Sequence, residues 1–382
     1  MQIAPFELER WQSVWENRVE LNISESGVEP MAIRDLLDDP AAAEMLLGLR
    51  LGYPQTNGTE ELRGRIAALY PGARAENAIL TAGCAEANFL VSWLMLEPGD
   101  EVVFMLPNYV QIQGLAQAFG ATVKPLWLRE KLRWAPDLDE LPRLITNKTK
   151  LVALCNPNNP TGATLSAEAC KAICAAAAKV GAYVLADEVY RGAELEGERT
   201  PSLWGGYDRL FCTGGLSKAY GLPGLRTGWI IGPPPMIEKL WTYHDYASMA
   251  PTMPTERLAL LALEPARNAR ILARTRDIVR RHYPIMRDWA ANHEGLLTHI
   301  PPRAGAIAWF GYGTGWKSAE MGEELRTKKG VLIVPGDQLG MDFYFRVGFG
   351  GDVAVLRKAL GRIDEWMAEK SSRPMASRAP SA

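Results

Sequence analysis

One lysine in a glycine-rich stretch is the first residue that could do chemistry. Lys218 lies in a segment that begins at Gly215 and runs through Arg226 to Gly228. Glycines allow sharp turns and a close approach of the backbone to a ligand. No acidic residue lies near Lys218 in the local sequence. This favours an amine that forms an imine over one that forms a surface ion pair. The planar guanidinium of Arg226 suits a phosphate. For this stretch alone, a solvated surface lysine is the alternative.

Polar residues also follow other short apolar runs. Gly83, Cys84 and Ala85 open a predicted helix, whose first backbone amides could bind an anion. A tight strand-to-helix turn is the alternative there. Tyr109 follows the next apolar run and could stack on a flat ring or pack in the core.

The loop 156–162 and the residues after it add an amide and a carboxylate. Two prolines and a glycine make this loop rigid, and Asn159 within it can offer amide hydrogen bonds. Asp187 comes directly after an apolar run, where burying a carboxylate is costly unless a cation pairs with it. Capping of a turn is the alternative for Asp187.

Alternating strand and helix patterns position these residues. The predicted strands of a large domain are 78–81, 102–106, 122–126, 151–155, 183–186, 210–213 and 228–231. Because helical patterns separate most of them, we predict an α/β fold with a mostly parallel seven-stranded sheet and helices on both faces. Ligands of such sheets bind at the carboxyl ends of the strands.

A smaller α+β domain is predicted from the N-terminal segment and the C-terminal third. The predicted division is 1–40 for an N-terminal segment that packs with the small domain, 41–265 for the large domain and 266–370 for the small domain. Residues 371–382 are rich in Ser, Pro and Ala, which predicts a disordered tail.

Composition excludes several classes of function. The chain has 382 residues, 47% hydrophobic and 23% charged, and a formal net charge of −2. This balance gives no support for nucleic-acid or membrane binding. The first residues lack the pattern of a signal peptide, so we predict a cytoplasmic protein. No cluster of cysteines and histidines has metal-ligand spacing, so no metal site is predicted.

Taken together, the motifs resemble a known family. The segments 159–162, 187–190 and 217–218, with Arg226, occur in the order and spacing of the class I/II aminotransferases of fold type I, which use pyridoxal 5′-phosphate. The resemblance extends from about Gly27 to the last predicted helix. It implies an α/β enzyme that binds small amino acids and 2-oxo acids.

The resemblance implies roles for the cofactor's ring. Lys218 would hold the cofactor as an imine and move the substrate proton, and Asp187 would pair with the pyridine nitrogen. Tyr190 and Asn159 would hydrogen-bond the phenolate oxygen. Tyr109 would stack on the ring.

The resemblance also implies how the phosphate and the substrate are held. The phosphate would bind to Arg226, Ser217 and the helix start at Gly83, Cys84 and Ala85. The substrate carboxylate would bind to Arg346, with Asn159 and Gly27 beside it. Tyr53 would reach the phosphate of a neighbouring subunit, which implies a homodimer with shared sites.

One position departs from the family pattern. The family often has a hydroxyl ligand for the phosphate two residues before the Ser-Lys pair, where this chain has Gly215. Either Arg226 and backbone amides carry more of the binding, or Thr213 compensates.

The predicted activity is ping-pong transamination between an amino acid and a 2-oxo acid. Two segments, 24–28 and 216–226, also resemble capreomycidine synthase, which implies elimination with cyclisation as an alternative. A non-catalytic aminotransferase-like binding module is a third possibility. Glu25, close to Gly27 in the sequence, could meet a cationic substrate side chain.

Overall fold

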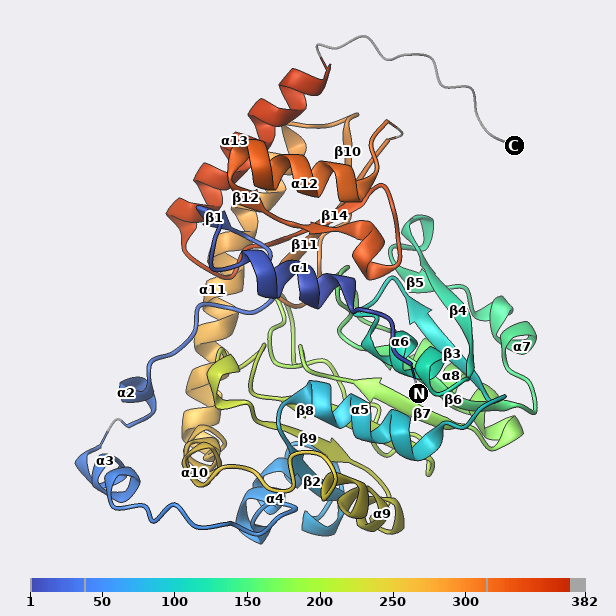
Figure 1. Ribbon diagram of the computed structural model, residues 1–382, viewed down its shortest axis with the longest axis vertical. Helices are drawn as coiled ribbons and strands as arrows, with labels where there is room; N and C mark the ends of the chain where they lie inside the picture. The colour runs from blue at the N-terminus through green and yellow to red at the C-terminus, as the bar shows by residue number, and fades with distance from the viewer. Residues whose placement is uncertain (1, 38, 314, 372–382) are drawn as a thin grey trace.

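An eight-stranded sheet forms the centre of the structure, a computed structural model that describes residues 2–37, 39–313 and 315–371 (Figure 1). In spatial order its strands are β2 (Ala78–Thr81), β9 (Gly228–Ile231), β8 (Leu210–Gly215), β7 (Tyr183–Asp187), β6 (Thr149–Cys155), β3 (Glu101–Leu106), β4 (Thr122–Arg129) and β5 (Ala135–Pro136). The strands from β8 to β4 are parallel, whereas β9 is antiparallel to both of its neighbours. The predicted mostly parallel sheet is confirmed, and the short β5 adds an eighth strand at its edge.

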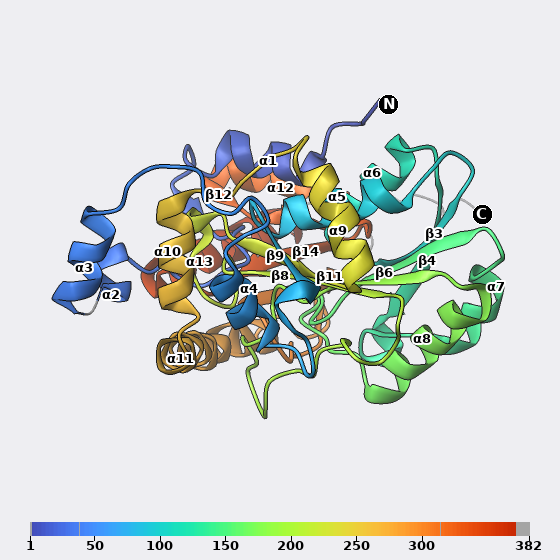
Figure 2. The same ribbon diagram turned by 90° about the horizontal axis from the view of Figure 1, so that it is seen from below.

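Helices cover both faces of this sheet because its central strands are apolar on both sides. Val102 and Phe104 of β3 pack with α5 (Cys84–Met95) and α9 (Pro234–His244). Val103 and Met105 point the other way and pack in a core shared with α8 (Ala167–Val180) and α10 (Met253–Ala262). Alternate residues of a strand face opposite sides, so one strand supplies both cores. Figure 2 shows α5 and α9 on one side of the sheet and α8 on the other.

Local sequence signals set the helix ends. Ser166 caps α8 by accepting a hydrogen bond from the backbone of Ala169, and Gly181 ends the helix with a φ of 69°. Thr59 caps α4 (Glu60–Ala67) in the same way. The sequence alone predicts these roles, with Ser166 and Thr59 as helix caps and Gly181 as a helix end. Two shorter helices of the large domain are α6 (Gln111–Ala118) and α7 (Leu141–Leu144).

A four-stranded antiparallel sheet forms a second core. Its order is β10 (Leu297–His299), β11 (Ile307–Tyr312), β14 (Tyr344–Gly348) and β13 (Val334–Pro335). It packs with α11 (Pro265–Ala291), α12 (Ser318–Lys329) and α13 (Val353–Ser371). α10 and α11 are separate helices, because Glu264 caps a new helix that begins with a proline.

The N-terminal segment joins this second core. After α1 (Glu7–Trp15), β1 (Leu21–Asn22) pairs in parallel with β12 (Val331–Leu332). The indole of Trp11 donates to the carbonyl of Ile333. The domain limits stay predictions. Ser371, predicted as the first residue of the tail, is instead the last residue of α13, and the rest of the predicted tail, from 372 onward, lies outside the described residues.

An arm leaves the body after the N-terminal segment. It holds α2 (Ile33–Leu36) and α3 (Pro40–Leu47), which lie away from the sheet in both views (Figures 1 and 2). Leu47 and Leu51 are each 81% exposed and Tyr53 is 83% exposed. Among the described residues, no helix is both long and apolar enough to cross a bilayer.

Candidate active site

A cavity of about 360 Å³ lies where the carboxyl ends of β6, β7 and β8 meet α1. Most of the site residues predicted from the sequence line it, namely Cys84, Ala85, Tyr109, Asn159, Asp187, Tyr190, Ser217, Lys218, Arg226 and Arg346. Gly27 and Gly83 lie beside it, since their positions are next to Lys218 and Arg226 respectively. Tyr53 lies on the exposed arm and does not line the cavity of its own chain.

Lys218 forms an ion pair in this cavity, which the local sequence did not indicate. Its Nζ lies 2.6 Å from Oε1 of Glu25, in the segment after β1. The same oxygen accepts hydrogen bonds from the backbone N–H groups of Ser26 and Gly27. The positive charge of Lys218 is the largest cause that lowers the pKa of Glu25, to about 2. Burial is the largest influence on the pKa of Lys218 and lowers it, but the charges of Glu25 and Tyr190 and the hydrogen bond to Glu25 together outweigh it, so the net pKa is raised.

Asp187 ends β7 as a buried carboxylate. It accepts hydrogen bonds from Nδ2 of Asn88 at 2.9 Å and from the backbone N–H of Val189 at 3.1 Å. Burial raises the pKa of Asp187. No cation pairs with Asp187 among the described residues. The site therefore holds a buried acid that lacks a positive partner.

Asn88 is oriented by a second buried residue. The hydroxyl of Thr213 donates to Oδ1 of Asn88 at 2.9 Å, which turns Nδ2 of the amide toward Asp187. Thr213 has no exposed surface, so its hydroxyl is committed to Asn88 rather than to a phosphate. The suggestion that Thr213 replaces the missing phosphate ligand is therefore not supported.

The backbone leaves no room for a side chain at Gly215. An added Cβ there would lie 2.9 Å from the carbonyl oxygen of Thr227, closer than real Cβ atoms come. A serine at this position would require the β8–β9 pairing to shift. The binding of an anion is thus left to Arg226 and the start of α5.

Arg226 packs directly over the N-terminus of α5. Gly83 precedes this helix with a φ of 85°, and an added Cβ would lie 2.5 Å from Nη2 of Arg226. Only a glycine allows this approach. The first backbone N–H groups of α5, from Cys84 and Ala85, have no partner within the helix and carry its positive dipole end. A guanidinium and a helix start at one place form an anion site.

Arg346 is almost fully buried and holds one unused donor. It is 1% exposed on β14. Its Nη1 donates to Oδ1 of Asn159 at 2.8 Å, and its Nη2 donates to the carbonyl of Ser24 at 2.6 Å. Its Nε has no hydrogen-bond partner among the described residues. A planar fork with a free buried N–H suits a carboxylate ligand.

Two tyrosines of the cavity have partners far away in the sequence. The hydroxyl of Tyr190 donates to Oγ of Ser26 at 2.9 Å. The hydroxyl of Tyr109 donates to Oε1 of Glu9 at 2.7 Å, and burial raises the pKa of Tyr109. The cofactor contacts assigned to both tyrosines stay predictions.

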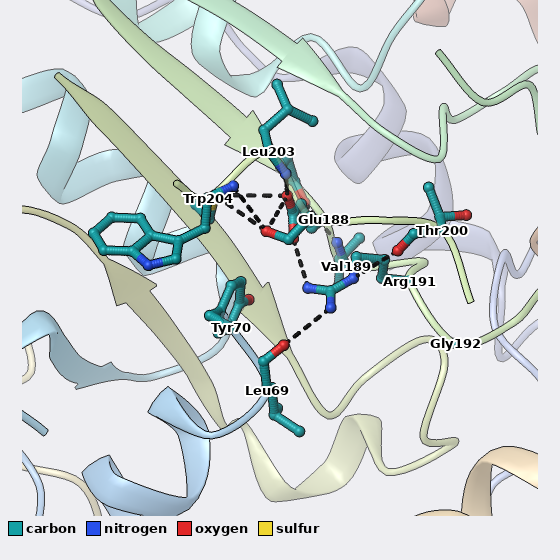
Figure 3. Close-up of polar contacts among 12 residues, drawn as sticks. Leu69, Tyr70, Glu188, Val189, Arg191, Gly192, Thr200, Leu203 and Trp204 are labelled. Carbon is teal, nitrogen blue, oxygen red and sulfur yellow. Dashed lines mark hydrogen bonds and ion pairs between the residues drawn. The ribbon is translucent and has the colours of Figure 1, made fainter. Parts of the chain in front are cut away.

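A buried ion pair holds the turn that carries Asp187 and Tyr190 (Figure 3). Nη1 of Arg191 lies 2.8 Å from Oε2 of Glu188, and the two side chains are 7% and 1% exposed. Arg191 also donates to the carbonyls of Thr200 and Leu69. The backbone between Asp187 and Tyr190 is therefore fixed from behind the cavity.

We expect Arg191→Met to lower the free energy of unfolding by about 3–5 kcal/mol, the usual cost of breaking a buried ion pair. The reason is that Glu188 would remain buried without its cation. Urea unfolding of the cofactor-free protein measures this change. Arg281→Met is the matched control, because the Arg281–Asp277 pair is 63% and 61% exposed. Its expected cost is below about 1 kcal/mol. Equal losses in the two variants would contradict the prediction.

The family follows from comparison with known proteins. The model of the family described as aminotransferase class I and II matches residues 34–363. The chain belongs to this family. The resemblance read from its motifs is confirmed.

Three known proteins are similar to this chain over most of its length. Capreomycidine synthase of Streptomyces vinaceus is 32% identical over 365 residues, covering 94% of this chain and 92% of that protein. Arginine–pyruvate transaminase of Pseudomonas aeruginosa is 29% identical over 335 residues, covering 85% and 84%. The solved structure of a PLP-dependent aminotransferase from Streptococcus suis is 30% identical, with a TM-score of 0.91, and covers 98% of this chain and 100% of that one.

The cofactor of this class I/II aminotransferase family member is pyridoxal phosphate, and the site fits it at three points. Arg226 over the start of α5 suits the phosphate. Lys218 reaches the same cavity and can bond to the aldehyde. Asp187, buried without a cation, suits a protonated pyridine nitrogen. These fits rest on the chain's own geometry.

Some residues of the site were missed in the sequence. Asn88, Ser26 and Glu16 all line the cavity. A signal existed only for Asn88, which lies one turn after Cys84 and so on the same face of α5. Ser26 and Glu16 reach the site only because the N-terminal segment folds over the sheet.

Proposed function

We propose that this chain is an aminotransferase that moves the amino group of an amino acid to a 2-oxo acid by a ping-pong reaction. The observation that carries the proposal is one cavity holding Lys218, a buried unpaired Asp187 and Arg346 with a free donor. Amino transfer requires an amine, an anion that pairs with the ring nitrogen of the cofactor, and a cation that binds the substrate carboxylate. Lys218, Asp187 and Arg346 are groups of these three kinds. The matched family supports the same activity.

Each residue has a task in the proposed reaction. Arg226 and the start of α5 hold the phosphate, and Asp187 holds the pyridine nitrogen in its protonated form. Bound pyridoxal phosphate supplies a sink for the electrons of the breaking Cα–H bond. Arg346 binds the substrate carboxylate, and this contact fixes the direction of the substrate's Cα–H bond. Lys218 would act as the proton carrier, taking the proton from the substrate Cα and giving it back at C4′ when the cofactor is bound.

The first half-reaction alone tests this proposal. With an amino acid and no oxo acid, we expect about one equivalent of oxo acid per subunit and a loss of the visible absorbance of the bound cofactor. Adding a 2-oxo acid should restore the absorbance, because the same site runs the reverse step. A screen of the common amino acids by absorbance finds the reacting ones. If none of them changes the spectrum, the proposal fails.

Elimination with cyclisation is the alternative function. The 32% identity to capreomycidine synthase over most of both chains favours it. An elimination regenerates the cofactor at each turnover, so the amino acid would be consumed far beyond one equivalent without any oxo acid. Quantifying product per subunit separates the two functions.

We also propose that the enzyme is a homodimer in which Tyr53 reaches the neighbouring subunit's phosphate. Tyr53 is 83% exposed on an arm that also exposes Leu47 and Leu51, which is unusual for a surface facing water. The cytoplasmic location stays a prediction.

For Tyr53→Phe we expect a dimer that loses the cofactor more readily, because one hydrogen bond to the phosphate is removed. Sedimentation gives the mass, and dialysis followed by absorbance gives the retained cofactor. Tyr246→Phe, another tyrosine with 85% exposure, is the control and should retain cofactor like the wild type. A wild-type protein that is monomeric and fully active would contradict the shared site.

A further inference from the structure

Three glutamates line the side of the cavity that faces the N-terminal segment. Glu9 lies in α1, Glu16 directly follows it and Glu25 follows β1. Burial raises the pKa of Glu16, and the charges of Glu25 and Glu9 raise it further. No hydrogen bond or ion pair to the Glu16 carboxylate is found among the described residues. This side of the cavity therefore holds mutually repelling negative charge.

The cations of the cavity are already committed elsewhere. Among the described lining residues they are Lys218, Arg226 and Arg346. Arg226 lies over the start of α5 at the phosphate end, and Arg346 is bonded to Asn159. Among these three cations, Lys218 is the one that forms an ion pair with a glutamate, Glu25, while the charges of Glu25 and Glu9 also act on the buried Arg346. None of the three is left for an acidic substrate side chain.

The partner of Glu25 is also temporary. Lys218 can neutralise Glu25 only while its nitrogen is an ammonium group. When this nitrogen is bonded to the cofactor, it no longer provides the full charge of a free ammonium group. Three carboxylates then share the cavity, and the cofactor's phosphate adds further negative charge nearby. The loaded site therefore lacks a free ammonium group beside Glu25.

A separate observation points to the ligand that fills this space. The unpartnered Nε of Arg346 is buried and belongs to a side chain that lines the same cavity. It indicates a ligand whose carboxylate binds at Arg346. The glutamates are then left for another part of that ligand. The α-amino group cannot be that part, since it reacts with the cofactor.

We propose that Glu9, Glu16 and Glu25 form the subsite for a cationic substrate side chain, a guanidinium or an ammonium group. This inference rests on the proposed function, because it assumes that Arg346 holds the substrate carboxylate. A cation meets three carboxylates there, whereas an acidic side chain meets like charge. The subsite thus selects basic amino acids over acidic ones.

Ligands that cannot react provide the test. 5-Guanidinopentanoate and 5-ureidopentanoate have the same length and no α-amino group, and only the first is cationic. We expect the cofactor-loaded wild type to bind the guanidino acid about tenfold more tightly or better, as measured by calorimetry. 6-Aminohexanoate shows whether ammonium is accepted as well as guanidinium. Adipate, which is acidic at both ends, should bind most weakly.

Variants that remove one carboxylate charge show which glutamates cause the preference for the guanidino acid over the ureido acid. Glu25→Gln and Glu16→Gln should each reduce the ratio of the two affinities several-fold and leave the affinity for the ureido acid unchanged. Glu7→Gln is the matched control, since Glu7 lies in α1 but does not line the cavity. It should keep the wild-type ratio. Glu16 forms no ion pair with Lys218. If Glu25→Gln does not fold because the Glu25–Lys218 pair is lost, Glu16→Gln therefore still tests the inference.

Two results would overturn the inference. One is a wild type that binds the guanidino acid no better than the ureido acid or adipate. The other is an unchanged preference in both glutamine variants. Either result leaves the proposed function intact if uncharged amino acids still convert the bound cofactor. Failure of every amino acid to do so would instead remove the proposed function.

Discussion

Lys218→Ala is expected to slow the first half-reaction by at least about 100-fold, the lower end of what a positioned acid–base group contributes. The loss follows because Lys218 is the only amine lining the cavity among the described residues, so nothing replaces it as proton carrier. Single-turnover absorbance with a reacting amino acid measures the rate. Reduction of the loaded wild type with borohydride should fix the cofactor covalently on the peptide that contains Lys218.

Lys239→Ala is the control for this experiment. Lys239 lies on an exposed part of α9 and does not line the cavity. Its rate and its labelled peptide should match those of the wild type. A Lys218→Ala protein that is still labelled, or that keeps the wild-type rate, would show that another amine holds the cofactor.

The predictable part of the site is the part that follows strand ends. Asp187 comes directly after an apolar run and Lys218 comes a few residues after another, and parallel strands bring their carboxyl ends to one edge. Gly83 is also predictable, because a glycine before a helix suggests a close ligand. The large sheet was predictable for the same reason, since strands buried on both faces are nearly continuous apolar runs.

Contacts between distant segments were not predictable. Glu25 contacts Lys218, although 193 positions of the sequence separate them, and Tyr190 contacts Ser26 over a separation of 164. Such pairs depend on where the N-terminal segment lies over the sheet, and no local pattern encodes that. The absence of an acid near Lys218 in the sequence was therefore a poor guide to its partner in space.

Very short elements were missed for a different reason. β1, β5, β12 and β13 have two residues each, too few to show an alternating pattern. The break between α10 and α11 did carry a signal, Glu264 followed by a proline. A capping side chain before a proline ends one helix and begins the next.

Asp187→Asn is expected to slow the same half-reaction by about 10²–10³-fold, the usual loss when one preorganised electrostatic group is removed. An amide cannot hold the pyridine nitrogen in its protonated form, so the bound cofactor withdraws electrons less strongly. Single-turnover absorbance again gives the rate. Asp208→Asn is the control, because Asp208 has the same chemistry but does not line the cavity.

Stability against pH tests the same role without catalysis. In the cofactor-free wild type, burial raises the pKa of Asp187 above that of an unfolded aspartate, about 3.9. Its ionised form therefore destabilises the folded chain at neutral pH, and this penalty disappears as the pH falls below both values. Relative to Asp187→Asn, the cofactor-free wild type should gain stability as the pH is lowered from neutral to about 4.

Loading the cofactor should reverse this trend. A protonated pyridine nitrogen beside Asp187 favours its ionised form and lowers its pKa. The loaded wild type should then show no such gain between neutral pH and about 4, and should lose stability relative to loaded Asp187→Asn below about pH 4, where the unfolded aspartate becomes protonated. Thermal unfolding of the four samples at several pH values measures both slopes. Slopes of the same sign with and without cofactor would mean that Asp187 does not meet the pyridine nitrogen. Opposite slopes would tie the buried acid to the cofactor by a property that does not depend on turnover.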